Sequence, residues 1–79
     1  MKLKELNFKN AGDSFIFLND VVGKHDDVTI SVYRIRNVTN YNNGTQVSVI
    51  NLKSFQGDAF GRNDQLVLNR EIRFVALPK

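Results

Sequence analysis

The chain has no cysteine and no tryptophan, and it has one proline and one histidine in 79 residues. Without cysteine there are no disulfides, no thiolate nucleophiles and no zinc sites built on sulfur, so His25 alone is left for imidazole chemistry. No apolar run is longer than Phe15 to Leu18, far short of the roughly 20 residues that cross a bilayer. The amino terminus lacks the apolar stretch of a secretory signal. We therefore expect a cytoplasmic protein that does not enter a membrane.

Composition predicts one folded unit. Apolar residue types make up 42% of the chain and charged types 24%, as in ordinary globular proteins. Because the chain is short and shows no linker, repeat or low-complexity tract, residues 1–79 are expected to form a single small β-barrel domain. A domain of this size without covalent cross-links is marginally stable, so we expect self-association into a homo-oligomer.

Positive charge is in excess after Asp27, where seven basic residues stand against three acidic ones, and the net charge is +3. The basic residues there are Arg34, Arg36, Lys53, Arg62, Arg70, Arg73 and Lys79. Such asymmetry is typical of a polyanion-binding protein, because each Lys or Arg that neutralises a phosphate releases a counterion. The alternative is a solvated surface with a mild positive bias.

Two structures fit the segment that follows Asp13. The spacing of Phe15, Leu18 and Val21 predicts a short helix that is capped near Ser14 and ends at Gly23. Phenylalanine and isoleucine prefer strands, however, so the run from Phe15 to Leu18 also fits a buried strand.

The middle of the chain has the two-residue period of β-strands. Val28, Ile30 and Val32 alternate with polar residues, and the apolar phase then slips at Ile35. A second slip lies between Val49 and Ile50, within residues 45–53. A slip of one residue is the effect of a β-bulge, and bulges bend strands so that a small sheet can close on itself. The segment Tyr41-Asn42-Asn43-Gly44 predicts a tight hairpin turn between these strands.

The last part of the chain predicts a loop followed by strands. Residues 55–65 contain two glycines and several acids and amides, which is typical of a loop, and this loop carries Phe60 and Arg62. Alternation resumes at Leu66 and Leu68 and again at Ile72 and Phe74, with a turn at residues 69–71 between the two pairs. The expected fold is mainly β: a small closed or half-open antiparallel β-barrel, Sm-like or OB-like, with a short N-terminal helix.

Catalysis finds no support in the sequence. In His25-Asp26-Asp27, adjacent side chains of an extended backbone point in opposite directions and do not converge on one metal or proton. The chain lacks the lysine and hydroxyl of a phosphate-binding loop, and it lacks a Gly-x-Ser-x-Gly nucleophile elbow. We expect no enzyme activity, no metal and no cofactor.

Aromatic residues and basic residues are interleaved along the chain from Tyr33 onward. The candidate binding residues are Tyr33, Arg34, Arg36, Tyr41, Lys53, Phe60, Arg62, Arg70 and Arg73. Rings that stack on bases and guanidinium groups that hold phosphates are the elements of a single-strand binding surface. Tyr33, Tyr41 and Phe60 are the stacking candidates. For Tyr33 and Phe60 the ordinary alternative is packing on a strand or over the core.

One resemblance extends over nearly the whole chain. It is carried by Phe17-Leu18-Asn19, Val28-Thr29-Ile30, Asn43-Gly44, Ser54-Phe55, Gln65-Leu66-Val67 and the stretch from Ile72 to Val75 with the late Pro78. In these residues the chain resembles the bacterial RNA-binding Hfq proteins, which are Sm-like barrels. It departs from them by extra residues between Ile35 and Asn43, and by Leu68-Asn69-Arg70 in place of their Tyr-Lys-His signature. The resemblance implies a ring-shaped oligomer that binds single-stranded RNA, with Arg70 near a nucleotide.

A second resemblance covers the carboxyl half. Ser54-Phe55, Phe60-Gly61 and residues 66–79 are similar to the single-stranded-DNA-binding proteins of filamentous phages, which are dimeric OB-like barrels. Gly23-Lys24 is similar to the start of their DNA-binding wing, but the tyrosine that follows in those proteins is absent. Both resemblances imply binding of single-stranded nucleic acid, RNA or DNA. The competing hypothesis is a small protein-interaction module, an inhibitor or accessory subunit that binds an acidic protein partner.

Overall fold

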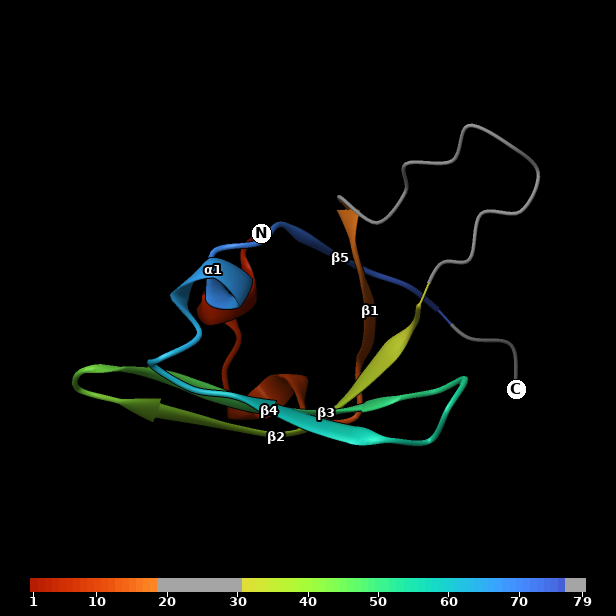
Figure 1. The fold of residues 1–79 in the computed structure, drawn as a ribbon, viewed down its shortest axis with the longest axis horizontal. Coiled ribbons are helices and arrows are strands. Elements are labelled where there is room, and N and C mark those ends of the chain that lie inside the picture. The colour runs from red at the N-terminus through yellow and green to blue at the C-terminus, as the bar shows by residue number, and fades with distance from the viewer. Residues whose placement is uncertain (19–30, 77–79) are drawn as a thin grey trace.

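The computed structural model describes residues 1–18 and 31–76, and its strands form one antiparallel sheet (Figure 1). The strands are β1 (Ser14–Phe17), β2 (Tyr33–Tyr41), β3 (Gly44–Asn51), β4 (Gly57–Phe60) and β5 (Ile72–Phe74). Their order in the sheet is β4-β3-β2-β1-β5. The protein is mainly β, as predicted. Over the described residues β4 and β5 are the two edges and do not pair with each other, so the sheet is open rather than closed.

The described helices are short. They are the 3-10 helices η1 (Leu3–Glu5) and η2 (Phe8–Asn10) and the helix α1 (Gln65–Leu68). The helix predicted to begin near Ser14 is wrong over Ser14–Phe17, which forms β1, and the alternative of a buried strand is confirmed there. This segment is a strand because it buries both Phe15 and Phe17 while its backbone pairs with β2 on one side and with β5 on the other. None of the described helices is long and apolar enough to cross a membrane.

Part of the sequence prediction falls on residues that the structure does not describe. These include Val28 and Ile30 of the predicted strand, the segment from residue 19 to Gly23, Lys24, His25-Asp26-Asp27, and Pro78-Lys79. The strand signal that began at Val28 continues in the described part of the chain as β2, which starts at Tyr33.

β2 contains a β-bulge, as expected for this region, but it lies just after Ile35 and not at the predicted phase slip before that residue. The pairing of β2 with β3 shifts between Ile35 and Asn37, so Arg36 is the extra residue. Because of this insertion Ile35 and Val38, three positions apart, are both buried against the core. The second predicted slip is wrong: Val49 and Ile50 pair in regular register with Ile35 and Arg34.

The hairpin that joins β2 and β3 is confirmed, with Tyr41 opposite Gly44 across the two-residue turn. Two other predictions for the second half are wrong. Residues 57–60, expected in a loop, form β4 because they pair with Val47–Ile50 of β3. Residues 66–68, expected in a strand, lie in α1, where Leu68 is buried and Leu66 is 91% exposed. The predicted turn at residues 69–71 is confirmed.

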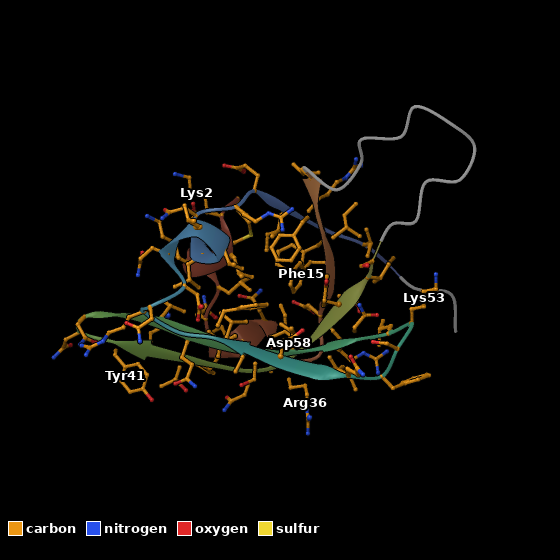
Figure 2. The ribbon with its side chains drawn as sticks, viewed as in Figure 1. Lys2, Phe15, Arg36, Tyr41, Lys53 and Asp58 are labelled. Atoms are coloured by element: carbon orange, nitrogen blue, oxygen red, sulfur yellow. The ribbon has the colours of Figure 1, made fainter. Side chains whose placement is uncertain are left out.

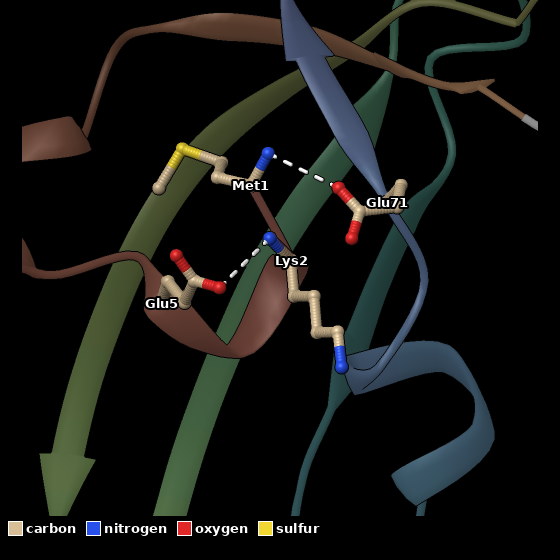
Figure 3. Close-up of polar contacts among 4 residues, drawn as sticks. All are labelled: Met1, Lys2, Glu5 and Glu71. Atoms are coloured by element: carbon tan, nitrogen blue, oxygen red, sulfur yellow. Dashed lines mark hydrogen bonds and ion pairs between the residues drawn. The ribbon is translucent and has the colours of Figure 1, made fainter.

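The core lies between the sheet and the N-terminal segment. Its buried side chains are Leu3, Leu6, Phe15, Phe17, Ile35, Val38, Val47, Val49, Leu68 and Ile72. Each large apolar side chain buried here contributes about 1.5–3 kcal/mol. Backbone bonds hold the N-terminal segment beside β5: the Ile72 amide donates to the Met1 carbonyl at 2.7 Å and the Leu3 amide to the Arg70 carbonyl at 3.0 Å. The Met1 amino group also lies 3.2 Å from Glu71 Oε2 (Figure 3).

Candidate nucleic-acid interface

No described helix or strand covers one face of β2, β3 and β4 (Figure 1), and we call it the outer face. Figure 1 shows α1, η1 and β5 on the opposite side of these strands. Strand alternation and register place the following residues on the outer face: Arg34, Arg36, Asn37, Thr39 and Tyr41 of β2, Gln46, Ser48 and Ile50 of β3, and Gly57 and Ala59 of β4. Arg36 and Tyr41 point away from the core side (Figure 2).

The bulge determines how many polar side chains the outer face carries. Ile35 and Val38 both point inward, so the two residues between them, Arg36 and Asn37, both project outward. A regular strand would turn one of these two side chains towards the core. The bulge therefore adds Asn37 to the face on which strand alternation already places Arg34 and Arg36.

Arg36 extends across β3 to the first residue of β4. A Cβ atom on Gly57 would lie 3.7 Å from Nη1 of Arg36. The guanidinium borders a shallow hollow of about 440 Å³, lined by Arg36, Asn37, Ser48, Val49, Gly57, Asp58 and Ala59. Most of these lining residues have small side chains, so the hollow is open to solvent beside a positive charge.

A second hollow lies at the hairpin end of the same strands. It has a volume of about 320 Å³ and is lined by Tyr41, Asn43, Gly44, Thr45, Gln46, Gly61 and Arg62. Tyr41 is 57% exposed. The β3–β4 pairing ends at Val47 and Phe60, so β3 has no β4 partner at this hollow. Arg62 packs against Gly44, where a Cβ would lie 3.5 Å from the Cβ of Arg62. One wall of the hollow is thus aromatic and another is cationic.

Arg34, Arg36 and Arg62 have no carboxylate partner in the described part of the chain. Among the residues that the structure describes, the one ion pair joins the Met1 amino group to Glu71, and Arg34, Arg36 and Arg62 take part in none. Of the residues that line the two hollows, one is acidic: Asp58, in the hollow beside Arg36. Its register opposite Val49 directs its side chain to the inner side of β4. The outer face is therefore cationic and can attract an anion without first breaking an ion pair.

Two of the predicted aromatic residues lie against the core instead. The Tyr33 ring stacks on Phe15 with centroids 5.6 Å apart and contacts Phe17 edge-on at 5.5 Å. Phe60 is partly buried against the core opposite Val47. This packing accounts for both residues without a ligand.

Of the remaining predicted residues, Arg70 and Arg73 lie near β1 and β5, and Lys53 lies in the turn between β3 and β4. Arg70 lies near β1, with its guanidinium carbon 4.1 Å from the centre of the Phe17 ring, and Arg73 is exposed on β5 opposite Ile16. Lys53 is exposed in the turn between β3 and β4. The structure thus brings Arg34, Arg36, Tyr41 and Arg62 together along the outer face, with Lys53 at one end, and it places Arg70 and Arg73 elsewhere.

Sequence reasoning missed Asn37 on the outer face and Phe55 in the turn that joins β3 and β4. Asn37 projects outward only because of the bulge, and the bulge position was not readable from the apolar pattern. Phe55, in the turn beside Lys53, is 75% exposed and has a positive φ. The sequence signal for an exposed Phe55 was the presence of a bulky aromatic residue between polar residues in a turn.

Within residues 1–18 and 31–76 no group of acidic or histidine side chains could hold a metal ion. Comparison with protein-family models, curated proteins and solved structures found no match to this chain.

Proposed function

We propose that the protein binds single-stranded nucleic acid through the outer face, without catalysing a reaction. The observation that carries the proposal is the presence of Arg34 and Arg36 on a sheet face that no described helix or strand covers, with Arg62 beside it, while none of the three forms an ion pair with a described residue. Each guanidinium can take a phosphate oxygen with two parallel hydrogen bonds. Tyr41, more than half exposed beside Arg62, supplies a ring for an unpaired base.

The shape of the outer face favours binding of single-stranded over double-stranded nucleic acid. An extended sheet with exposed rings lets unpaired bases lie on it, whereas duplex readers insert a helix or a ribbon into a groove. The outer face has no projecting element among its described residues, and its centre carries the small side chains of Ser48, Gly57 and Ala59. Backbone phosphates can therefore approach the arginines closely.

We further propose that the sheet is a half-open barrel of the Sm-like or OB-like type. β3 pairs with nearly the full length of β2, whereas β1 pairs with β2 only at Tyr33 and Arg34 before it pairs with β5. In Figure 1, β1 runs across the β2–β4 hairpins rather than alongside them. A sheet that bends this sharply at one strand has the curvature of a small barrel.

Titration with a fluorescently labelled oligonucleotide tests this function. If three arginines each neutralise one phosphate of a single strand, the slope of log K against log salt is about −2, so affinity falls about 20-fold between 50 and 200 mM salt. Replacing all three by glutamine should abolish most of this dependence. Lys2, Lys4 and Lys9, which lie on the N-terminal segment, provide a control triple of equal charge. Absence of binding at 50 mM salt would remove the proposal.

The open edge of β4 favours a protein partner as the second candidate. Within residues 1–18 and 31–76, Gly57–Phe60 pairs with β3 alone, and an unpaired edge can add a strand from another polypeptide. The partner would be an acidic protein or a second copy of this chain, as expected from the small size of the domain. Native mass measurement before and after nuclease treatment separates the cases, because a nuclease-resistant complex with protein favours this candidate and a nuclease-sensitive one favours nucleic acid.

A further inference from the structure

The turn between β3 and β4 holds an exposed phenylalanine in a strained conformation. Phe55 has a φ of +59° and is 75% exposed. Among the described residues other than glycine it alone has a positive φ. A side chain with a Cβ is disfavoured in this left-handed region, which glycine occupies freely and asparagine tolerates. Position 55 thus holds a residue whose Cβ is disfavoured in this backbone conformation and whose apolar ring is exposed to water.

The turn itself is rigid, so the strain is imposed on Phe55 by its surroundings. The Asn51 side-chain oxygen accepts hydrogen bonds from the Lys53 amide at 2.9 Å and the Ser54 amide at 3.2 Å. The Asn51 amide donates to the Gln56 carbonyl at 2.9 Å, and the Phe55 amide donates to the Asn51 carbonyl at 2.7 Å. Strain that is fixed in this way is a reason to look for a function of the strained residue.

Phe55 stands next to the arginine-bearing part of the outer face. Gly57, two residues further along the chain, is the residue over which the Arg36 guanidinium extends. Two residues span at most about 7 Å of backbone, so the Phe55 backbone is close to that guanidinium. Lys53 is exposed in the same turn. An exposed ring beside two cations is the combination that holds an unpaired base together with its flanking phosphates.

We infer that Phe55 is a stacking residue for an unpaired nucleobase, with Arg36 and Lys53 binding the phosphates beside it. The inference rests on the proposed function and adds a second aromatic contact to Tyr41. The two rings belong to opposite ends of β3, and the seven steps from Gly44 to Asn51 span about 24 Å. A bound strand therefore lies along β3 and covers several nucleotides.

A tryptophan at position 55 gives a direct optical test, because the chain contains no other tryptophan. Phe55→Trp is titrated with an oligothymidylate, and separately with a strand of equal length in which every nucleotide is abasic. Stacking predicts quenching of the tryptophan emission by the thymidylate strand and none by the abasic strand. Equal quenching by the two strands, or quenching by neither, would overturn the inference.

Phe55→Leu tests the same contact without a reporter, and it leaves the strained φ in place. We expect about tenfold weaker binding of the thymidylate strand and unchanged binding of the abasic strand. Phe8→Leu is the matched control, since Phe8 is 69% exposed on η2. If wild-type protein binds neither strand, the proposed function fails and the inference with it. If wild-type protein binds and Phe55→Leu binds the thymidylate strand equally well, only the inference fails.

Discussion

Arg36 of β2 extends across β3 and lies over Gly57 of the edge strand β4, with Nη1 3.7 Å from where a Cβ of that glycine would stand. Two local features produce this relationship. Strand alternation after the buried Ile35 turns Arg36 outward, and the absence of a side chain at Gly57 leaves room for the guanidinium above β4. The positive charge of Arg36 thereby reaches across the outer face to its β4 edge.

Gly57→Val should weaken nucleic-acid binding without changing the net charge. The branched side chain occupies the space above β4 and displaces the Arg36 guanidinium. Valine also suits a strand better than glycine does, so the free energy of unfolding should stay constant or rise by up to about 1 kcal/mol. Urea denaturation measures the stability, and fluorescence anisotropy with a labelled oligonucleotide measures the affinity, which should fall severalfold. Unchanged affinity would show that the space above Gly57 is not used.

Arg36→Gln should reduce the salt dependence of binding. Removing one phosphate contact to a single strand lowers the magnitude of the slope of log K against log salt by about 0.7. The measurement is a series of anisotropy titrations at increasing salt. Lys9→Gln removes the same charge from η2, away from the outer face, and should leave the slope unchanged. If the two variants change the slope equally, binding depends on net charge and not on the outer face.

The sequence predicted the parts of the fold that depend on local chemistry. Asn42-Asn43-Gly44 marked the β2–β3 hairpin because few other residues accept the backbone angles of a tight turn. The apolar alternation failed where tertiary contacts decide the structure. Leu66 and Leu68 look like strand residues, but only Leu68 reaches the core, and the intervening backbone forms α1.

The same limit applies to the candidate site. Arg34, Arg36 and Arg62 were identified by residue type, yet only the burial of Ile35 and its β3 partner Val49 shows that the face of the first two lies opposite the core. Tyr33 fits a binding pattern equally well in sequence, and the structure gives it core neighbours, Phe15 and Phe17. Residue type indicates what a side chain can bind, whereas long-range pairing decides whether that side chain reaches solvent.

Tyr33→Leu should act on stability and leave binding intact. The Tyr33 ring contacts two buried phenylalanines, and an aromatic pair contributes about 0.5–1.5 kcal/mol beyond its buried area. We expect the free energy of unfolding to fall by about 1–2 kcal/mol, with Tyr33→Phe close to wild type as the control. Urea denaturation gives these values. A folded Tyr33→Leu protein that retains stability but loses affinity for an oligonucleotide would instead identify Tyr33 as a base-stacking residue.

Phe55→Asn should raise stability while it lowers affinity. At a φ of +59° a residue with a Cβ costs roughly 1–2 kcal/mol, and asparagine tolerates that region better because its short side chain bonds locally. Loss of the ring removes little packing, since Phe55 is 75% exposed. The free energy of unfolding should therefore increase by about 1 kcal/mol, as measured in urea.

Phe8→Asn supplies the comparison for that stability gain. Phe8 is also largely exposed, but its backbone is in η2, so exchanging it for asparagine relieves no left-handed conformation and should change stability by less than about 0.5 kcal/mol. A gain at position 55 together with weaker binding of a thymidylate strand means that the native residue is kept at the expense of stability, as expected for a side chain that contacts a ligand. A loss of stability in Phe55→Asn would mean that the ring packs favourably in the folded protein, and the strain would then need no functional explanation.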